Sequence, residues 1–358
     1  MRLLSKLLLA FTFPAVFTAA SAFEPARISL ISTSQDLVHF DVAGTWPDTC
    51  PPQLLEVSAQ GRDILLLATR ETEGCRATPT PYAFSSTAQA RDRLFDENGI
   101  HRVRLEVEGA LENDPMLAGF ALVRNGNAAS ALTLETGFWW AEQGGQFSAG
   151  PGLGLSVETQ GDMISLSVMG YGERGDSAWY FGAGELNEGM AHLDLGQFEG
   201  GAGPFARYAA PDAISLSGFV DVETLTPSRA ILWFSRADAE SGKIHLRPLS
   251  IMRFSFAQEP GEALLGRWLI AGTEADVRAT RWVEWIRSEA FDGGFVLHDA
   301  EGSTTLQCDT PAHQPGSPPA ICRMESIDGE VIEFTDVAFR RLSGWDANTR
   351  RIMAFRLD

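Results

Sequence analysis

The side chains that could do chemistry in this sequence are few, and they do not gather into a known catalytic pattern. The nearest approach to the Gly-x-Ser-x-Gly elbow of serine hydrolases is Gln146-Phe-Ser-Ala-Gly150, which lacks the first glycine. The six histidines are scattered, with neither a His-x-His nor a His-Glu-x-x-His cluster that could hold a metal ion. The sequence therefore indicates no catalytic residue, no metal ligand and no cofactor.

Four titratable residues that are close together in the chain could act as an acid–base set. They are Glu185, Glu188, His192 and Asp194, which would line one rim if their strands lie side by side. Alternating polar residues on the solvent-facing side of a strand explain the same pattern without any chemistry. We therefore favour a solvated strand face over an active site here.

Four cysteines fall into two pairs that are local in the sequence, Cys50 with Cys75 and Cys308 with Cys322. An even number of cysteines in local pairs is typical of disulfides if the chain reaches an oxidising compartment. No spacing is Cys-x-x-Cys, which argues against a zinc site. Four cysteines allow three connectivities, of which we expect the two local pairs, leaving no free thiol.

Aromatic residues are unusually dense in one stretch, which contains Trp139, Trp140, Tyr171, Trp179 and Tyr180. Neighbouring residues on a strand point to opposite faces, so Trp139 and Trp140 cannot both lie in one core. The outward ring is either covered by a neighbouring domain or forms an exposed stacking surface. We expect a contact surface among these five residues, for another domain, a carbohydrate, an apolar ligand or another protein.

The elements that position these rings are β-strands. Between residues 137 and 184, alternating apolar runs are separated by Gln160-Gly-Asp and by Gly172-Glu-Arg-Gly-Asp. Short glycine-containing turns between runs of period two are a strong hairpin signal. The pattern predicts an antiparallel meander in which Gly161 and Gly175 have positive φ.

Short alternating runs with turns between them continue on both sides of this stretch. The expected strands cover residues 28–32, 37–42, 54–59, 63–69, 82–86, 101–108, 190–198, 213–224, 229–236, 242–247, 252–256, 280–287, 294–299, 303–308, 321–326, 331–339 and 351–357. The sequence predicts an all-β chain. Its first unit is an immunoglobulin-like sandwich, followed by antiparallel meander units that close into barrels or sandwiches.

Two polar breaks divide this all-β chain. They are Asn125-Gly-Asn-Ala-Ala-Ser and Gln258-Glu-Pro-Gly-Glu, which predict domains at residues 23–130, 131–258 and 259–358. The opening Gly137-Phe-Trp139 of the second unit recurs as Gly266-Arg-Trp268 in the third. The second and third units are therefore expected to be related, although Gly-x-Trp is a weak repeat signal.

Residues 1–22 resemble a secretory signal peptide. A short basic start is followed by an apolar run through Phe17 and by the small-residue cleavage site Ala20-Ser-Ala22. We expect an exported, periplasmic or secreted protein with no transmembrane segment after removal of this peptide. The formal net charge of −19 on 358 residues argues against nucleic-acid binding, because such a surface repels phosphate.

Three motifs of the aromatic stretch occur together. They are Gly137-Phe-Trp-Trp140, Gly152-Leu-Gly-Leu-Ser-Val-Glu-Thr-Gln-Gly-Asp162 and Tyr171-Gly-Glu-Arg-Gly-Asp-Ser-Ala-Trp-Tyr180. This series resembles an uncharacterised β-rich module of exported proteobacterial proteins over about residues 135–256. The chain departs from that module at Met169-Gly170, where the module has a Trp and a hydroxyl residue. The resemblance implies export and a β-fold, and it assigns no catalytic residue.

These observations favour a non-enzymatic binding or interaction module that presents aromatic contact surface. The first alternative is a hydrolase-type enzyme on a β-barrel scaffold, which would need a cleft with paired carboxylates of perturbed pKa. The second is an outer-membrane barrel, which would need an unbroken apolar outer band, whereas Arg281, Glu284 and Arg287 interrupt the most aromatic strand.

Overall fold

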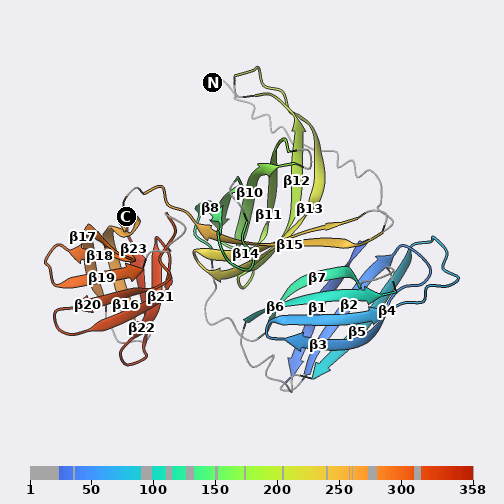
Figure 1. Ribbon diagram of the computed structural model, residues 1–358, viewed down its shortest axis with the longest axis horizontal. Coiled ribbons are helices and arrows are strands. Elements are labelled where there is room, and N and C mark those ends of the chain that lie inside the picture. The colour runs from blue at the N-terminus through green and yellow to red at the C-terminus, as the bar shows by residue number, and fades with distance from the viewer. Residues whose placement is uncertain are drawn as a thin grey trace, which may run out of the picture.

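The structure is a computed structural model in which three β-sheet units, called the N-terminal, central and C-terminal bodies, lie in a row (Figure 1). It describes residues 24–34, 37–89, 99–109, 115–125, 133–149, 152–172, 175–203, 205–238, 241–257, 259, 261–272, 280–309 and 316–357. The expected signal peptide at residues 1–22 lies outside the described residues, as do residues 126–130 of the first expected boundary. The all-β fold class predicted from the sequence is confirmed.

The N-terminal body is a sandwich built from seven strands. They are β1 (Glu24–Ser34), β2 (Leu37–Trp46), β3 (Gln53–Gln60), β4 (Asp63–Thr69), β5 (Thr80–Gln89), β6 (Gly99–Glu108) and β7 (Met116–Asn125), in the order β3-β4-β6-β7-β1-β2-β5. β1 pairs antiparallel with β2 and touches β7 in parallel at Ala26 and Gly119, so it links the two layers. β4 and β6 also pair in parallel. Alternate residues of β2, β4 and β6 supply the core between the layers.

The central body is a closed barrel of eight antiparallel strands (Figure 1). They are β8 (Gly137–Ala141), β9 (Gly154–Gln160), β10 (Met163–Tyr171), β11 (Ser177–Glu185), β12 (Met190–Gly200), β13 (Pro211–Thr226), β14 (Arg229–Ala237) and β15 (Ile244–Arg253). The predicted turns are in place, since Gly161 has φ 62° and Gly175 has φ 81°. Because the meander closes into a barrel, no strand edge is left unpaired. Closure is a usual way for an antiparallel sheet of this length to avoid exposed edges.

The C-terminal body is a second closed barrel of eight strands, which follows the short 3-10 helix η2 (Glu262–Leu264). The strands are β16 (Gly266–Gly272), β17 (Arg281–Phe291), β18 (Gly294–Asp299), β19 (Thr304–Asp309), β20 (Cys322–Ser326), β21 (Val331–Val337), β22 (Arg341–Asp346) and β23 (Arg351–Arg356). Large side chains, among them Trp268, Trp285 and Phe334, fill its interior.

The two barrels are built alike at the start of their first strands. Trp139 and Trp268 are both buried, and each indole Nε1 donates to the backbone carbonyl four residues earlier at 2.9 Å. Each tryptophan also pairs across the sheet with an arginine of the last strand, Arg253 and Arg356 respectively. The Gly-x-Trp motif therefore marks the same structural position in both barrels, as expected for related units.

Three features of the strands differ from the sequence-based expectations. β7 and β22 were not expected, because neither has a simple alternation of apolar and polar residues. β15 is one strand, whereas the sequence suggested two at residues 242–247 and 252–256. Pro248 lies within it opposite Trp233, and the strand continues through the proline to pair with β8.

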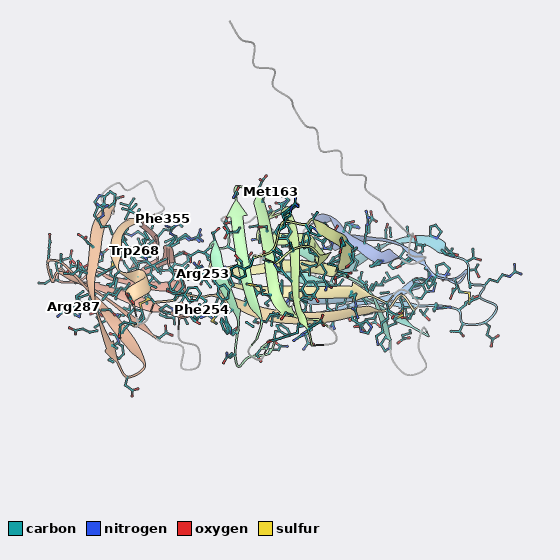
Figure 2. All side chains as sticks on the ribbon, turned by 90° about the horizontal axis from the view of Figure 1, so that it is seen from above. Met163, Arg253, Phe254, Trp268, Arg287 and Phe355 are labelled. Carbon is teal, nitrogen blue, oxygen red and sulfur yellow. A yellow bond between two sulfur atoms is a disulfide. The ribbon has the colours of Figure 1, made fainter. Side chains whose placement is uncertain are left out.

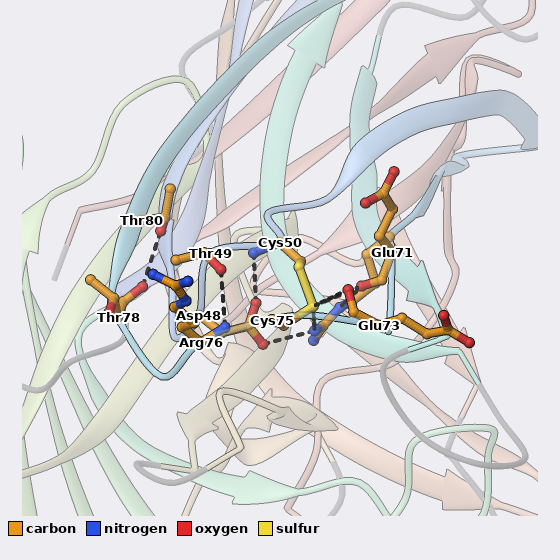
Figure 3. Close-up of a disulfide and its surroundings, with 10 residues drawn as sticks. Asp48, Thr49, Cys50, Glu71, Glu73, Cys75, Arg76, Thr78 and Thr80 are labelled. Carbon is orange, nitrogen blue, oxygen red and sulfur yellow. Dashed lines mark hydrogen bonds and ion pairs between the residues drawn. A yellow bond between two sulfur atoms is a disulfide. The ribbon is translucent and has the colours of Figure 1, made fainter.

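The two predicted disulfides, Cys50–Cys75 and Cys308–Cys322, are present. The first closes a loop on the sandwich, where Asp48 accepts bonds from the Cys50 N–H and from Arg70 (Figure 3). The second joins directly opposite residues of β19 and β20 and faces the barrel interior. Two disulfides indicate an oxidising, non-cytoplasmic compartment. Among the described residues, no helix has the length and apolar character to span a membrane.

The sandwich docks on the central barrel through a buried ion pair. The Arg102 guanidinium on β6 donates to both carboxylate oxygens of Glu223 on β13, at 2.9 and 3.0 Å. Glu223 is fully buried and also accepts a hydrogen bond from the Trp233 indole at 2.9 Å. Phe120 of β7 packs against Trp233 with ring centroids 5.1 Å apart.

The C-terminal barrel contacts the end of the central barrel at which β8 begins. The Glu135 carboxylate accepts the backbone N–H groups of Phe339 and Arg340 at 3.0 and 2.6 Å. Ser228 donates to the carbonyl of Val337 at 2.7 Å. Figure 2 shows Arg253 beside this junction. These contacts lie at one end of the central barrel, and the turns that join β10 to β11, β12 to β13 and β14 to β15 lie at the opposite end.

Candidate functional site

A large cavity opens at the end of the central barrel that faces away from the C-terminal barrel. Its volume is about 1120 Å³. It is bounded by the turns that join β10 to β11, β12 to β13 and β14 to β15, together with the loop that leads into β9. The side chains that matter for its chemistry are Leu153, Val168, Tyr171, Asp176, Tyr180, Leu195, Gln197, Glu199, Phe234, Arg236, His245, Arg247 and Leu249.

The floor of the cavity is apolar because it continues the barrel core. Val168, Leu195 and Leu249 are buried at inward positions of β10, β12 and β15. Leu153 and Phe234 pack against the same core and are partly buried. Alternate residues of a strand point to one face, so the inward set stays apolar until the strands reach the mouth. This floor can accommodate an apolar group of a ligand.

Two tyrosines line the cavity above this floor. Tyr180 lies opposite Val168 on the neighbouring strand, faces inward and packs against the core. Tyr171 ends β10 and is 66% exposed, with its ring beside Gly152. A Cβ at Gly152 would lie 3.1 Å from the Tyr171 ring, so the glycine allows this close approach. Both rings offer an apolar face and a hydroxyl to a ligand in the mouth.

The rim of the cavity carries charges of both signs on separate walls. Arg236, His245 and Arg247 lie on β14 and β15, which are adjacent strands. Asp176 precedes β11, and Glu199 lies near the end of β12. The sequence-based interpretation did not single out any of these five residues. Four of them occupy ordinary alternating strand positions and Asp176 lies in a turn, and only closure of the barrel turns them toward one cavity.

The five aromatic residues predicted to form a contact surface do not lie together. Trp139 is fully buried in the barrel core, so its place in that surface was wrong. Trp140 is half-buried and contacts Phe138 and Phe254, with ring centroids 6.1 and 5.4 Å away. Phe254 is labelled at the junction with the second barrel in Figure 2.

The other three aromatic residues lie on two different surfaces of the barrel. Tyr171 and Tyr180 line the cavity. Trp179 is 52% exposed on the outer face of β11, where it stacks on Phe198 with ring centroids 5.6 Å apart. The structure thus brings only the two tyrosines into the candidate site.

The suspected acid–base set does not line the cavity. His192 Nδ1 lies 2.8 Å from Asp221 Oδ1 on the outside of the barrel, and the imidazole stacks on Phe219. The hydrogen bond with Asp221 raises the pKa of His192 above its ordinary value. Glu188 lies near Arg124 of the sandwich, which donates to its backbone carbonyl. These contacts fit a structural role at the junction between the sandwich and the barrel.

One group of the described residues has the spacing of metal ligands, namely Asp48, Cys50 and Cys75. Its two sulfur atoms are bonded to each other as a disulfide and are not available as thiolates. The Asp48 carboxylate is already held by Arg70 at 2.7 Å. This group therefore serves to fix the loop.

Comparison of the chain with protein-family models and with the curated proteins gives no match.

Proposed function

We propose that this protein is an exported, non-enzymatic binding protein whose central barrel holds a small, largely apolar ligand. The observation that carries the proposal is the cavity of about 1120 Å³, with its apolar floor and polar rim. Ligand pockets are typically concave, mostly apolar and equipped with a few polar groups that orient the ligand. Barrels of eight strands are wide enough to enclose one small ligand.

Export is supported by the two disulfides and by the signal-like residues 1–22. A carrier in an oxidising compartment needs a stable scaffold with a binding end that remains open. The buried contacts of this barrel with the sandwich and with the second barrel leave its mouth open. No nucleophile–base pair is needed for such a function.

A fluorescent apolar probe, N-phenyl-1-naphthylamine, tests the proposal in the full-length protein. We expect saturable binding of one probe per chain, with enhanced probe emission. Ala149→Trp and Leu153→Trp each place a large ring in the cavity and should weaken binding at least tenfold. Ser148→Trp is the matched control, because Ser148 is exposed next to Ala149 and does not line the cavity.

Equal probe binding by the wild type and both cavity variants would contradict the proposal, provided that circular dichroism shows all proteins folded. Absence of saturable binding by the wild type would contradict it as well. A change in the Ser148→Trp variant as large as in the cavity variants would place the probe outside the cavity.

A second candidate is a row of large side chains on the outer face of the same barrel, which contains one of the five aromatic residues expected to form a contact surface, Trp179. Met169, Trp179, Phe198 and Ile214 lie opposite one another across β10 to β13, and Trp179 is half exposed. Such a row suits stacking of a sugar ring. Trp179→Ala should abolish any binding of soluble oligosaccharides measured by calorimetry, and unchanged binding would reject this surface.

A further inference from the structure

We propose that the wall formed by Arg236, His245 and Arg247 selects ligands with an anionic head group. The inference rests on the proposed function, because it concerns the head group of the ligand that the same cavity would hold. The ligand class is an amphiphile with an apolar body and a carboxylate- or phosphate-type head.

The register of β14 and β15 orders these side chains from the core to the mouth. Leu232 lies opposite Leu249, and both are buried. The next pair on the same face is Phe234 with Arg247, followed by Arg236 with His245. Because side chains two residues apart share a face, this wall changes within three residue pairs from two leucines, through one aromatic and one basic residue, to two basic residues.

This wall carries basic side chains on a protein that is acidic overall. The chain carries a formal net charge of −19, yet three basic residues lie together on two adjacent strands at the cavity mouth. Arg236 and Arg247 are diagonal neighbours on this strand pair, where like charges repel each other. Within the described part of the chain, Arg247 has no ion pair with an acidic side chain, so a bound anion would relieve this repulsion.

The opposite wall gives the head group its orientation. Asp176 and Glu199 lie across the mouth on the β10–β11 turn and on β12. An anion would be repelled by these carboxylates and attracted by the arginine wall. A guanidinium can also donate two parallel hydrogen bonds to a carboxylate or a phosphate. The apolar body of the ligand would then lie over Phe234, Leu195 and Leu249.

A series of twelve-carbon probes isolates the contribution of the head group. Dodecanoate, dodecyl phosphate, dodecanol and dodecylamine are titrated below their critical micelle concentrations against the full-length protein, and displacement of N-phenyl-1-naphthylamine is measured. We expect both anionic probes to bind about tenfold tighter than dodecanol, on the scale of one charge-assisted hydrogen bond. Comparison of the two anionic probes distinguishes a carboxylate head from a phosphate head.

Arg247→Gln and Arg236→Gln should each weaken dodecanoate binding about tenfold and leave dodecanol binding unchanged. Arg247→Lys keeps the positive charge and should retain most of the preference for dodecanoate over dodecanol. Arg207→Gln is the matched control for loss of one positive charge, because Arg207 is exposed on the β12–β13 connection, outside the cavity lining. It should bind every probe as the wild type does.

Equal affinity of the wild type for dodecanoate and dodecanol would overturn the inference and leave the proposed function standing. A preference for dodecylamine, or anion binding that survives both glutamine substitutions, would overturn it in the same way. Failure of all four probes to bind would overturn the inference and the proposed function together.

Discussion

Replacing Glu223 by glutamine should strongly destabilise the junction between the sandwich and the central barrel. The Glu223 carboxylate is fully buried, and it accepts two hydrogen bonds from Arg102 and one from Trp233. Glutamine keeps the size of the side chain but removes its charge and one acceptor. The Arg102 guanidinium, whose side chain is only 16% exposed, would then keep only the more exposed Asp63 carboxylate, 3.8 Å from its Nη1, as a counter-ion.

Removing one partner of a buried ion pair typically costs about 3–5 kcal/mol, because the remaining charge stays desolvated. The Arg102 guanidinium carbon also lies 5.0 Å from the centroid of the Trp233 ring. This cation–π contact offsets a small part of the lost stability. We therefore expect Glu223→Gln to lower the free energy of unfolding by about 3 kcal/mol. Urea denaturation measures this difference, and hydrogen exchange of β6 and β13 locates it at the junction.

The chain contains a matched control for this substitution. Arg323 and Glu325 form an ion pair at 2.8 Å, but both side chains are more than half exposed. Glu325→Gln should therefore change the free energy of unfolding by less than about 1 kcal/mol. The double substitution Arg102→Met with Glu223→Met removes both charges and should be far less destabilising than Glu223→Gln alone. If Glu223→Gln costs no more than Glu325→Gln, the Arg102–Glu223 pair does not stabilise the junction as proposed.

Three further predictions concern the central barrel. Trp139→Ala should lower the free energy of unfolding by about 3–5 kcal/mol, whereas Trp140→Ala should leave the barrel folded; equal losses in thermal denaturation would contradict the assignment of opposite faces. Because the folded pKa of His192 is raised, its contribution to stability is present below its unfolded pKa of about 6.5 and is lost as the pH rises through the folded pKa. His192→Asn should thus lower the melting temperature more at pH 5.5 than at pH 8.5. Because the His192 side chain is half exposed, we expect the difference to correspond to less than about 1 kcal/mol of stability. A loss of melting temperature that does not depend on pH would refute this prediction. Gly161→Val should cost about 1–3 kcal/mol through backbone strain alone, while Gly145→Val, at an exposed position without positive φ, should cost less; equal unfolding midpoints would refute the turn assignment.

The sequence predicted the parts of the fold that have a strong local signal. Gly161 and Gly175 marked their turns because each is flanked by runs of period two. The cysteines paired locally because they are close in the chain. Trp139 and Trp140 were expected on opposite faces from pleat geometry alone, and Trp139 is indeed in the core while Trp140 is not.

The strands that the sequence missed lack that local signal for physical reasons. β7 reads as an almost continuous apolar run, because one face packs in the sandwich and Phe120 on the strand packs against Trp233 of the barrel. In β22, Gly344 lies against the backbone of Glu333, next to a register shift in the pairing with β21. A bulged strand of this kind does not keep the period of two.

The candidate site was the least predictable part. Tyr171 and Tyr180 attracted attention because they are aromatic, but the cavity they line depends on long-range closure of eight strands. Arg236, His245 and Arg247 alternate with other residues as they would on any solvent-facing strand. Nothing in their local sequence shows that the polar side faces a barrel interior, since strand alternation defines two faces without saying which one is enclosed.

The most direct test of the binding function is methyl NMR of full-length protein with labelled Leu and Val, titrated with N-phenyl-1-naphthylamine. Leu195 and Leu249 line the cavity, whereas Leu297 and Leu306 are buried in the core of the second barrel. A ligand held in the central barrel should shift the methyl resonances of Leu195 and Leu249 in a saturable manner and leave those of Leu297 and Leu306 unchanged. Absence of any shift at Leu195 and Leu249 up to the solubility limit of the probe would contradict the binding function, and so would shifts confined to other parts of the protein.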